Sequence, residues 1–297
     1  MIIKRCQRQG KVRLVLLSEL LSMRDLDISK SIKLVRHQDP NYDTKYLYKR
    51  GMLDFYQSIQ TKDRFGNCEY LISFLGYEQS KAIYIGAYKV IGKPTFNKSL
   101  ENVPPDYPYM EVFEQPLFHY EIEKIDLLND LADRLVIDWG ASTRSWCQWL
   151  RNNPKRVVEI LPAGYVKEFS GFEDVILTFD ELQTIVKSPD PNRIWHTMLS
   201  SVAGVYLITD MTDGNQYVGS ASGKLGIMGR WRSYAETKHG GNIKLMALLQ
   251  VEPERYKNFQ YSILRTLPKS LTQTEVVSFE QKYKQKLGSR AFGLNGN

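Results

Sequence analysis

The first half of the chain is dominated by segments in which apolar and polar residues alternate. Tyr70 to Leu75 and Ala82 to Val90 are rich in β-branched and aromatic residues, and Gly76 to Lys81 separates them. This pattern predicts two paired strands joined by a turn, because such side chains fit a half-buried sheet. Leu117 to Ile125 alternates in the same way and predicts a further strand. The first region is therefore expected to contain a substantial β-sheet.

Helical spacing interrupts this pattern further along. Thr143 to Leu150 is predicted to form a helix, because Trp146 and Trp149 are three residues apart and would share one helix face. Arg156 to Leu161 and Asp174 to Phe179 then read as short apolar strands. The first region thus combines the two-residue period of strands with the helical period. This combination predicts an α+β fold, a mixed domain with a substantial sheet.

A proline-rich segment marks the expected domain boundary. Asp180 is expected to cap a short helix over Glu181 to Val186. Ser188 to Asn192 then holds two prolines within three residues, which disfavour helix and strand alike. We interpret this segment as a linker. The expected domains are therefore residues 1–188 and residues 193–297, in agreement with the length of 297 residues and a usual domain size of about 100–200 residues.

The second region opens with a predicted β-hairpin. Gly204 to Ile208 and Gln216 to Gly219 are short strand-like segments, and the turn Asp213-Gly214-Asn215 separates them. Arg230 and Tyr234 follow four residues apart and would project from one face of a helix. The segments expected next are a break at His239 to Asn242, a helix over Ile243 to Leu249 and a third strand over Phe259 to Leu264.

The last predicted helix carries an acidic residue on its apolar face. Thr272 and Glu275 form a capping box that sets the start of this helix. Val276, Glu280, Tyr283 and Leu287 then recur at helical spacing. An ionised carboxylate on such a face is costly unless a cation or strong donors meet it. Glu280 is therefore expected to meet a metal ion or an arginine.

Composition and charge narrow the classes of protein further. A hydrophobic content of 42% and a charged content of 25% are typical of a folded protein. No run of about 18 apolar residues predicts a membrane span. The three cysteines form no CxxC pair, which favours a reducing, cytoplasmic setting.

The net charge of +7 is unevenly distributed along the chain. Residues 1–200 hold 27 basic and 26 acidic residues, whereas residues 201–297 hold 13 and 7. The surplus of the second region favours a polyanion as its partner, with an ordinary solvated surface as the alternative. The nearly neutral first region argues against non-specific clamping of duplex DNA.

Taken in order, the residues of the second region resemble the GIY-YIG nuclease superfamily. The matching elements are Gly204-Val205-Tyr206, Tyr217-Val218-Gly219, Arg230, Glu280 and Asn295. The resemblance covers about residues 200–297. It implies a small α/β domain in which helices flank a three-stranded antiparallel sheet. It also implies cleavage of phosphodiester bonds with a divalent metal ion, Mg²⁺ or alternatively Mn²⁺. Homing endonucleases, restriction enzymes and the incision subunit of nucleotide excision repair belong to this superfamily.

The resemblance also implies roles for individual residues. Glu280 matches the sole protein ligand of the metal ion, and Arg230 would hold the scissile phosphate through its planar guanidinium. Tyr206 matches a tyrosine proposed as the general base, a role that requires a depressed pKa. Tyr217 would position water. Tyr234, His239 and Asn295 complete the expected catalytic set, and His239 matches a histidine of some members more loosely.

Each of these residues also has a purely structural interpretation. Tyr206 and Tyr217 could be ordinary strand tyrosines, His239 could cap the break beside its glycines, and Asn295 could belong to the tail. The cations expected to contact nucleic acid are Lys224, Arg230, Arg232, Lys238 and Lys244. Arg230 by itself would be an ordinary solvated residue, so the joint pattern carries the assignment.

The resulting hypothesis is a metal-dependent endonuclease that cleaves duplex DNA, plausible in restriction or anti-phage defence. The alternatives are a DNA-repair nuclease, an RNA-directed nuclease and a non-catalytic nucleic-acid-binding protein with the same fold. One active site of this kind cuts one strand, so double-strand cleavage would require dimerisation or two binding events. No membrane partner is expected.

The first region is interpreted as the target-recognition domain. Its aromatic residues could stack an extruded or single-stranded base, or they could fill a β-rich core. His37 and His119 have no metal-ligand spacing and are interpreted as structural. The aromatic residues of the first region in question are Tyr70, Tyr77, Tyr84, Tyr88, Tyr107, Tyr109 and Phe113.

Overall fold

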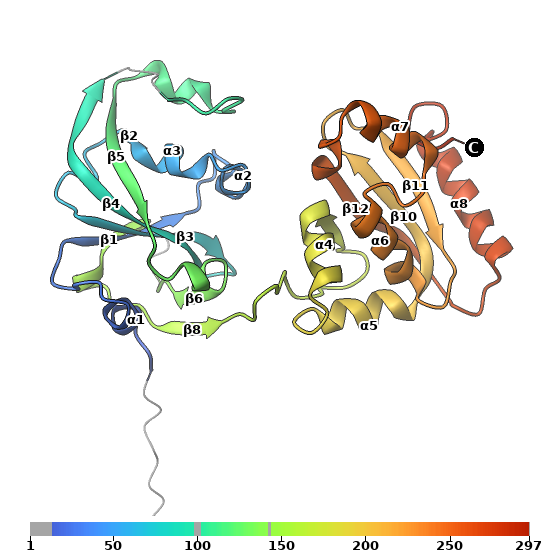
Figure 1. Cartoon of the computed structure of the whole chain (residues 1–297), viewed down its shortest axis with the longest axis horizontal. Helices are drawn as coiled ribbons and strands as arrows, with labels where there is room; N and C mark the ends of the chain where they lie inside the picture. Colours follow the sequence, from blue (N-terminus) through green and yellow to red (C-terminus); the bar gives the residue numbers. More distant parts are fainter. Residues whose placement is uncertain (1–13, 98–101, 142–143, 297) are drawn as a thin grey trace, which may run out of the picture. The chain divides into compact units, whose positions relative to one another are not determined.

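The computed structural model describes residues 14–97, 102–141 and 144–296. The chain divides into two compact units, residues 1–161 and residues 162–297 (Figure 1). The boundary therefore falls before the proline-rich segment from Ser188 to Asn192, which lies inside the second unit. There it connects α4 (Phe179–Lys187) with α5 (Arg193–Ser201).

The side chain of Asn192 explains why this segment is a turn of the second unit. It is buried and donates to the carbonyl oxygens of Gly164, at 2.7 Å, and Ser188, at 2.8 Å. Its own oxygen accepts from the backbone nitrogen of Val166 at 3.1 Å. Two of these hydrogen bonds fasten the turn to the first residues of this unit, and the third lies within the turn. Prolines are tolerated there because turns need few backbone donors.

The N-terminal unit is built on an eight-stranded sheet with the order β2-β5-β4-β3-β1-β7, while β6 pairs with β4 and β8 pairs with β6. The predicted hairpin is present as the antiparallel pair β3 and β4, and β1 pairs with β3 in parallel. The strands are β1 (Ile32–His37), β2 (Ile59–Gln60), β3 (Tyr70–Tyr77), β4 (Lys81–Asn97), β5 (Leu117–Ile125), β6 (Leu135–Asp138), β7 (Cys147–Trp149) and β8 (Val157–Ile160).

Short helices pack around this sheet (Figure 1). Buried aromatic and aliphatic side chains on both of its faces form the core, with Tyr84 and Trp139 among the largest. The helices of this unit are α1 (Leu17–Met23), α2 (Thr44–Lys49), α3 (Leu53–Ser58) and the 3₁₀ turns η1 (Met110–Glu114), η2 (Asn129–Leu131) and η3 (Leu150–Asn152).

The predicted helix from Thr143 to Leu150 is wrong where the structure describes it, and Thr143 itself lies outside the described residues. Cys147 to Trp149 form strand β7, which pairs with β1, and a 3₁₀ turn begins at Leu150. The tryptophan spacing suggested one helix face. Pairing with the otherwise free edge of β1 satisfies the backbone groups of this segment and outweighs that local preference.

The C-terminal unit contains a four-stranded antiparallel sheet with the order β11-β10-β12-β9. The three expected strands are β10 (Ala203–Asp210), β11 (Gln216–Ala221) and β12 (Phe259–Leu267). The fourth strand, β9 (Ile176–Thr178), pairs with β12 and comes from residues that were expected to belong to the first domain. It leads directly into α4, whose N-cap is Thr178 rather than the expected Asp180.

Helices cover both faces of this sheet (Figure 1). Residues of α4, α5 and α6 (Gly226–Thr237) pack with Tyr206 and Trp231 in one buried cluster. Val276 of α8 (Gln273–Leu287) packs with Val205 and Val218 in a second cluster on the opposite face. The remaining elements are α7 (Ile243–Val251) and the 3₁₀ turn η4 (Arg255–Asn258). In the part of the chain that the structure describes, no helix has the length and hydropathy needed to cross a bilayer.

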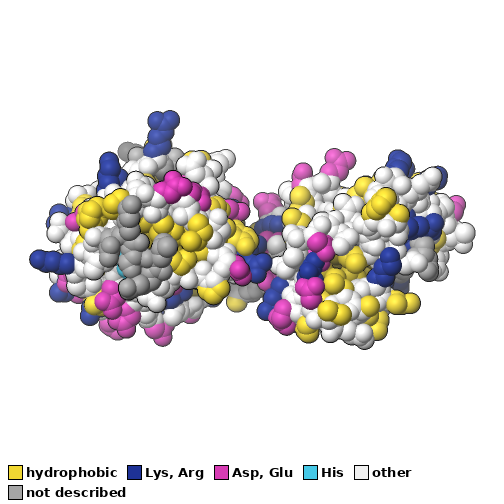
Figure 2. Space-filling view, turned by 90° about the horizontal axis from the view of Figure 1, so that it is seen from above, with side chains coloured by type: hydrophobic (Ala, Val, Ile, Leu, Met, Phe, Trp, Pro, Cys, Tyr) yellow, Lys and Arg dark blue, Asp and Glu magenta, His cyan; other side chains and the backbone are white. Residues whose placement is uncertain are grey.

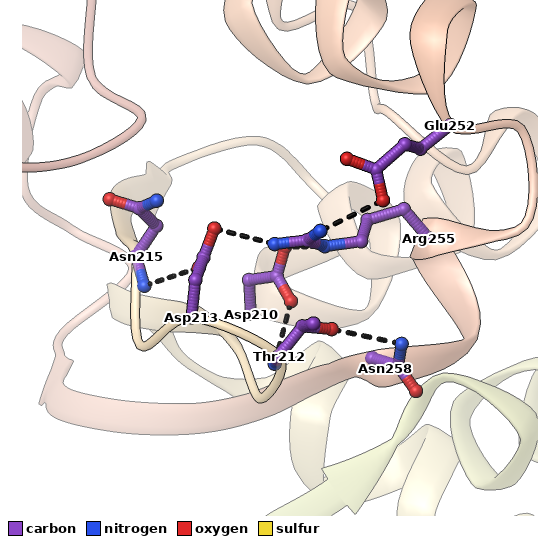
Figure 3. Close-up of polar contacts among 7 residues, drawn as sticks. All are labelled: Asp210, Thr212, Asp213, Asn215, Glu252, Arg255 and Asn258. Carbon is purple, nitrogen blue, oxygen red and sulfur yellow. Dashed lines mark hydrogen bonds and ion pairs between the residues drawn. The ribbon is translucent and has the colours of Figure 1, made fainter. Parts of the chain in front are cut away.

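An arginine braces the hairpin that carries Gly204-Val205-Tyr206 and Tyr217-Val218-Gly219 (Figure 3). The Arg255 guanidinium contacts Asp210 at 2.6 Å, Asp213 at 2.5 Å and Glu252 at 2.8 Å. Asp210 is fully buried, so this pairing offsets the cost of removing its charge from water. The brace joins the end of β10 and its turn to α7 and η4, which keeps β10 and β11 in a defined position.

Candidate active site

Two buried tyrosines and an arginine form the centre of the candidate site. Tyr206 lies on β10, and Arg230 and Tyr234 project from the same face of α6, as predicted. The two phenol oxygens are 3.2 Å apart. Arg230 donates from Nε to the Tyr206 oxygen at 3.3 Å and from a terminal nitrogen to the Tyr234 oxygen at 3.4 Å. The guanidinium is thereby held in one orientation beside both hydroxyls.

Gly219 allows this cluster to form against β11. Tyr206 and Gly219 are partners in the antiparallel register. A Cβ atom at Gly219 would lie 2.4 Å from the Tyr206 hydroxyl, so any side chain here would displace the tyrosine. Tyr217, two residues earlier on the same strand, places its ring 6.3 Å from that of Tyr234. The glycine of the YVG segment is thus required by close approach.

The electrostatics of the cluster favour protonated tyrosines. Burial raises the pKa of Tyr206, and the Arg230 charge acts in the opposite direction without overcoming it. Burial also raises the pKa of Tyr234 well above its ordinary value. Both hydroxyls therefore stay protonated at neutral pH. The depressed pKa that a general base would need is not produced by the protein groups around Tyr206.

Glu280 meets a cation, as its position on an apolar helix face predicted, but the cation is a lysine. One oxygen of Glu280 lies 2.7 Å from the Lys284 ammonium, one helical turn later on α8. The other oxygen accepts a short hydrogen bond from the Ser220 hydroxyl. The Glu280 side chain is 14% exposed and that of Lys284 is 9% exposed, so this pair is largely removed from water. Sequence reasoning missed Ser220 and Lys284, although the i, i+4 spacing signals the pair.

Strand β11 separates Glu280 from the tyrosines. Successive residues of a strand face opposite sides of the sheet, so Ser220 and Gly219 lie on different faces. Tyr206 packs over Gly219 on the α6 side, while Glu280 reaches Ser220 from the α8 side. Because β11 is an edge strand, the two groups can meet a common ligand only around that edge.

The oxygen and nitrogen donors available at the site limit which metal ion these residues could hold. Among the described residues there is no group of three or more His, Cys, Asp or Glu side chains that could form a cage. Glu280 offers one carboxylate, of which one oxygen is paired with Lys284. An ion such as Mg²⁺ keeps several waters and accepts one or two protein carboxylates. The residues therefore fit a largely hydrated ion of this kind, provided that Lys284 releases its partner.

Asn295 stands beside the free edge of β11, the edge that does not pair with β10. Its side-chain amide, 2% exposed, accepts from the Val218 nitrogen at 2.9 Å and donates to the Val218 oxygen at 2.8 Å. The Ser289 hydroxyl donates to its oxygen at 2.6 Å. Asn295 thus continues the hydrogen bonding of β11 and fixes the YVG segment. Its contacts are those of a positioning residue.

His239 and the expected DNA-contacting cations lie around α6 and α7. His239 Nδ1 accepts from the Gly241 nitrogen at 3.0 Å, a capping contact that leaves Nε2 as the ring's donor. Lys244 donates to the Gly293 oxygen at 3.1 Å, and the Lys238 ammonium lies 4.0 Å from the centre of the Tyr256 ring. Lys224 is exposed and Arg232 is half-buried.

Figure 2 shows one face of the C-terminal unit, on which basic and acidic side chains are interspersed.

The tyrosine and arginine cluster, the edge-strand carboxylate and the antiparallel sheet define a nuclease-like α/β domain. Residues 202–295 match the family model of the GIY-YIG catalytic domain, which confirms the resemblance. The C-terminal unit therefore contains a GIY-YIG catalytic domain over residues 202–295, and a nuclease domain of this kind acts on nucleic acid.

Solved structures give a further likeness over the same part of the chain. The catalytic domain of the homing endonuclease I-TevI aligns with 31% of this chain and 96% of its own, at 23% identity and a TM-score of 0.26. A mutant of the catalytic domain of intron endonuclease I-TevI covers 32% and 94%, at 23% identity and a TM-score of 0.27. The comparison with curated proteins returns no match.

Proposed function

We propose that this protein hydrolyses phosphodiester bonds in duplex DNA with the help of a divalent metal ion, Mg²⁺ or Mn²⁺. The observation that carries the proposal is the Arg230 guanidinium, held against two buried tyrosine hydroxyls beside the strand whose other face meets Glu280. Hydrolysis of a phosphodiester requires a cation beside the non-bridging oxygens of the phosphate. It also requires a second positive charge on the other side of the scissile bond.

The residues have distinct proposed roles. Arg230 binds the scissile phosphate through its fork, and Glu280 would hold the metal ion. When bound, the ion would stabilise negative charge on the phosphate. In hydrolysis the water oxygen bonds to phosphorus as the ester bond breaks. The attacking water must give up a proton, and the leaving oxygen must take up a proton from solvent. Tyr206 can take that proton only if its pKa falls when substrate enters, because in the protein alone burial raises it.

The other residues of the expected set support these two. Tyr217 and Tyr234 orient water and phosphate beside Arg230, and Asn295 keeps the YVG segment in place. His239 offers Nε2 to the substrate, since its Nδ1 is engaged. Lys224 and Arg232, together with Lys238 and Lys244 once these leave their present contacts, would bind backbone phosphates.

We further propose a cytoplasmic role in restriction or anti-phage defence, with the N-terminal unit selecting the target. A repair nuclease is the alternative setting, because both need a nuclease joined to a recognition unit. Double-strand cleavage would then proceed through dimers or two successive events. An RNA-directed nuclease and a protein that binds without cutting are the competing activities.

The experiment is a cleavage assay with the full chain on supercoiled plasmid DNA, with Mg²⁺, with Mn²⁺ and with EDTA. Modified and unmodified phage DNA and a single-stranded RNA are added as further substrates. Cleavage of DNA should require the metal ion, and Glu280→Gln should lower its rate by about 10²-fold or more. Glu236→Gln, an exposed carboxylate on α6, is the matched control and should cut normally. Undiminished cleavage by Glu280→Gln contradicts the proposal, and preferential cutting of RNA selects the competing activity.

A further inference from the structure

The N-terminal unit contains a cavity at the carboxyl end of strand β1. We call it the His37 cavity. Its volume is about 270 Å³. Small-molecule sites usually measure about 300–1,000 Å³, so this cavity suits one flat ring system rather than a large ligand. Residues from β1, α3, β2 and β5 and from the loops between them line it. The lining includes His37, Tyr42, Tyr56, Arg64 and Trp146.

Aromatic rings form much of the wall of this cavity. Tyr42 and Tyr56 are half-buried and pack edge to face, with ring centres 5.8 Å apart. Trp146 is also half-buried, and it leans on the buried ring of Phe65 at 6.4 Å. Aromatic rings that line open space can stack a nucleobase, which contributes about 1–3 kcal/mol per base. By contrast, Tyr84, Tyr88 and Tyr107, three of the aromatic residues named from the sequence, are buried in the core. The other four are half-buried.

A buried polar group with free bonding capacity also lines the cavity. His37 is 6% exposed, and its Nε2 lies 2.9 Å from the Gln57 side-chain oxygen. That oxygen also accepts from the Ser73 hydroxyl, so Nε2 of His37 is the donor of the pair. Among the residues that the structure describes, none forms a hydrogen bond with His37 Nδ1. Burial lowers the His37 pKa to about 4, so the ring is neutral and Nδ1 presents a lone pair to an N–H group.

The charged side chains that line the cavity are one carboxylate, Asp39, and two guanidinium groups, Arg36 and Arg64. Asp39 is already engaged, since it accepts from the Asn41 nitrogen at 2.9 Å and from the Tyr56 hydroxyl at 3.3 Å. The Arg36 guanidinium donates to the carbonyl oxygens of Gln79 and Lys81. The exposed Arg64 lies at the mouth, 5.8 Å from the centre of the Trp146 ring. This arrangement favours an uncharged ring whose attached chain carries a negative charge.

We propose that the His37 cavity binds one nucleobase extruded from the DNA that the C-terminal unit cuts. Tyr42, Tyr56 and Trp146 stack the base, His37 accepts a hydrogen bond from its N–H edge, and Arg64 contacts the adjacent phosphate. The proposal rests on the proposed action on DNA. It assigns the nearly neutral N-terminal unit a recognition task that depends on base contacts rather than on net charge.

The test uses the full chain and three labelled duplexes in EDTA, with affinity measured by fluorescence anisotropy. The first duplex is fully paired, the second has one unpaired base at its centre, and the third has an abasic residue at that position. An unpaired base costs less to extrude, so the second duplex should bind about tenfold more tightly than the third. Tyr42→Ala and Trp146→Ala should abolish this difference. Tyr46→Ala, an exposed tyrosine four residues from Tyr42, should preserve it.

The outcomes separate this proposal from the nuclease assignment. Equal affinities for the unpaired-base and abasic duplexes overturn the cavity proposal, and so does discrimination that survives in both variants. Tyr42→Leu, which keeps apolar volume without an aromatic face, serves as the second variant if Tyr42→Ala fails to fold. Cleavage in Mg²⁺ is measured on the same duplexes. If the protein cleaves DNA but binds the unpaired-base and abasic duplexes equally, only the cavity proposal is wrong. If it distinguishes these duplexes but cleaves none of them, only the proposed nuclease activity is wrong.

Discussion

The two units of this chain present their chemistry in opposite ways. In the C-terminal unit, residues in recognisable order along the chain build the candidate site, and Tyr206, Arg230 and Tyr234 meet because a hairpin and one helix place them together. In the N-terminal unit, the residues of the His37 cavity come from four separate stretches of the chain with no shared motif. A site assembled from a local motif can be found from sequence, whereas a site assembled from scattered loops cannot.

The polar groups of the two sites also differ in their partners. In the candidate active site the tyrosine hydroxyls share Arg230, and Glu280 is held by Lys284 and Ser220. The neighbouring Trp231 Nε1 and the Tyr261 hydroxyl have no partner among the described residues. In the N-terminal unit, Gln57 keeps its side-chain nitrogen without a partner beside His37. Such a group is costly unless something else satisfies it. The reacting groups of the candidate active site are thus paired in the protein alone, whereas the Gln57 nitrogen beside His37 has no partner among the described residues.

The largest expected effect concerns the catalytic side of this comparison. Arg230→Ala should lower the cleavage rate about 10²–10³-fold, because the cation beside the phosphate is lost. Arg230→Lys should recover only part of the rate, since an ammonium keeps the charge but not the planar fork. Single-turnover cleavage kinetics measure both. Arg232→Ala, two residues along α6, is the control and should change the rate by less than about tenfold.

The contrast would break down if Arg232→Ala proved as damaging as Arg230→Ala. That result would mean that the tyrosine contacts of Arg230 carry no special role, and that general positive charge on α6 governs cleavage.

The second effect belongs to the N-terminal unit and depends on pH. Burial lowers the His37 pKa to about 4 from its ordinary 6.5, although the nearby Asp54 carboxylate and the Gln57 contact act against this shift. Between these values the unfolded chain binds a proton that the folded unit does not. Stability is therefore full above about pH 6.5 and decreases as the pH falls to about 4. The loss amounts to about 3 kcal/mol.

Urea unfolding of the N-terminal unit between pH 4 and pH 7.5 measures this loss, with His37→Gln as the comparison. The variant has no imidazole to protonate, so its stability should vary less over the same range. A slope that is identical in both proteins would assign the pH dependence to other groups.

The smallest effect concerns the edge of the catalytic sheet. Asn295→Ala removes two hydrogen bonds to the backbone of Val218, which should cost the C-terminal unit about 1–3 kcal/mol. Hydrogen exchange at the Val218 amide should accelerate, because Asn295 is the acceptor for that N–H. Ser289→Ala removes only one contact to the same side chain and should show a smaller change.

Exchange at Val218 that is unchanged in Asn295→Ala would show that the tail does not hold β11. It would return Asn295 to the direct catalytic role that the resemblance implied.

Much of the fold could be predicted from local pattern. The β3–β4 hairpin, the β10–β11 hairpin, the helix after Ile243 and the capping box at Thr272 are confirmed, because each depends on residues close in sequence. The helix expected at Trp146 and Trp149 failed, and so did the limit of three strands in the C-terminal sheet. In both cases pairing with a distant strand decided the structure.

The candidate site likewise has features that local sequence predicts and features that depend on distant neighbours. The order and spacing of Tyr206, Tyr217, Arg230 and Glu280 indicate the class of the C-terminal domain, since a motif records which chemical groups a domain carries. Tertiary structure alone decided that Lys284 and Ser220 hold Glu280, that β11 stands between that carboxylate and the tyrosines, and that His37 borders a cavity. The physical reason is that hydrogen bonding, burial and pKa depend on neighbours that folding brings from distant positions, and spacing along one chain does not encode them.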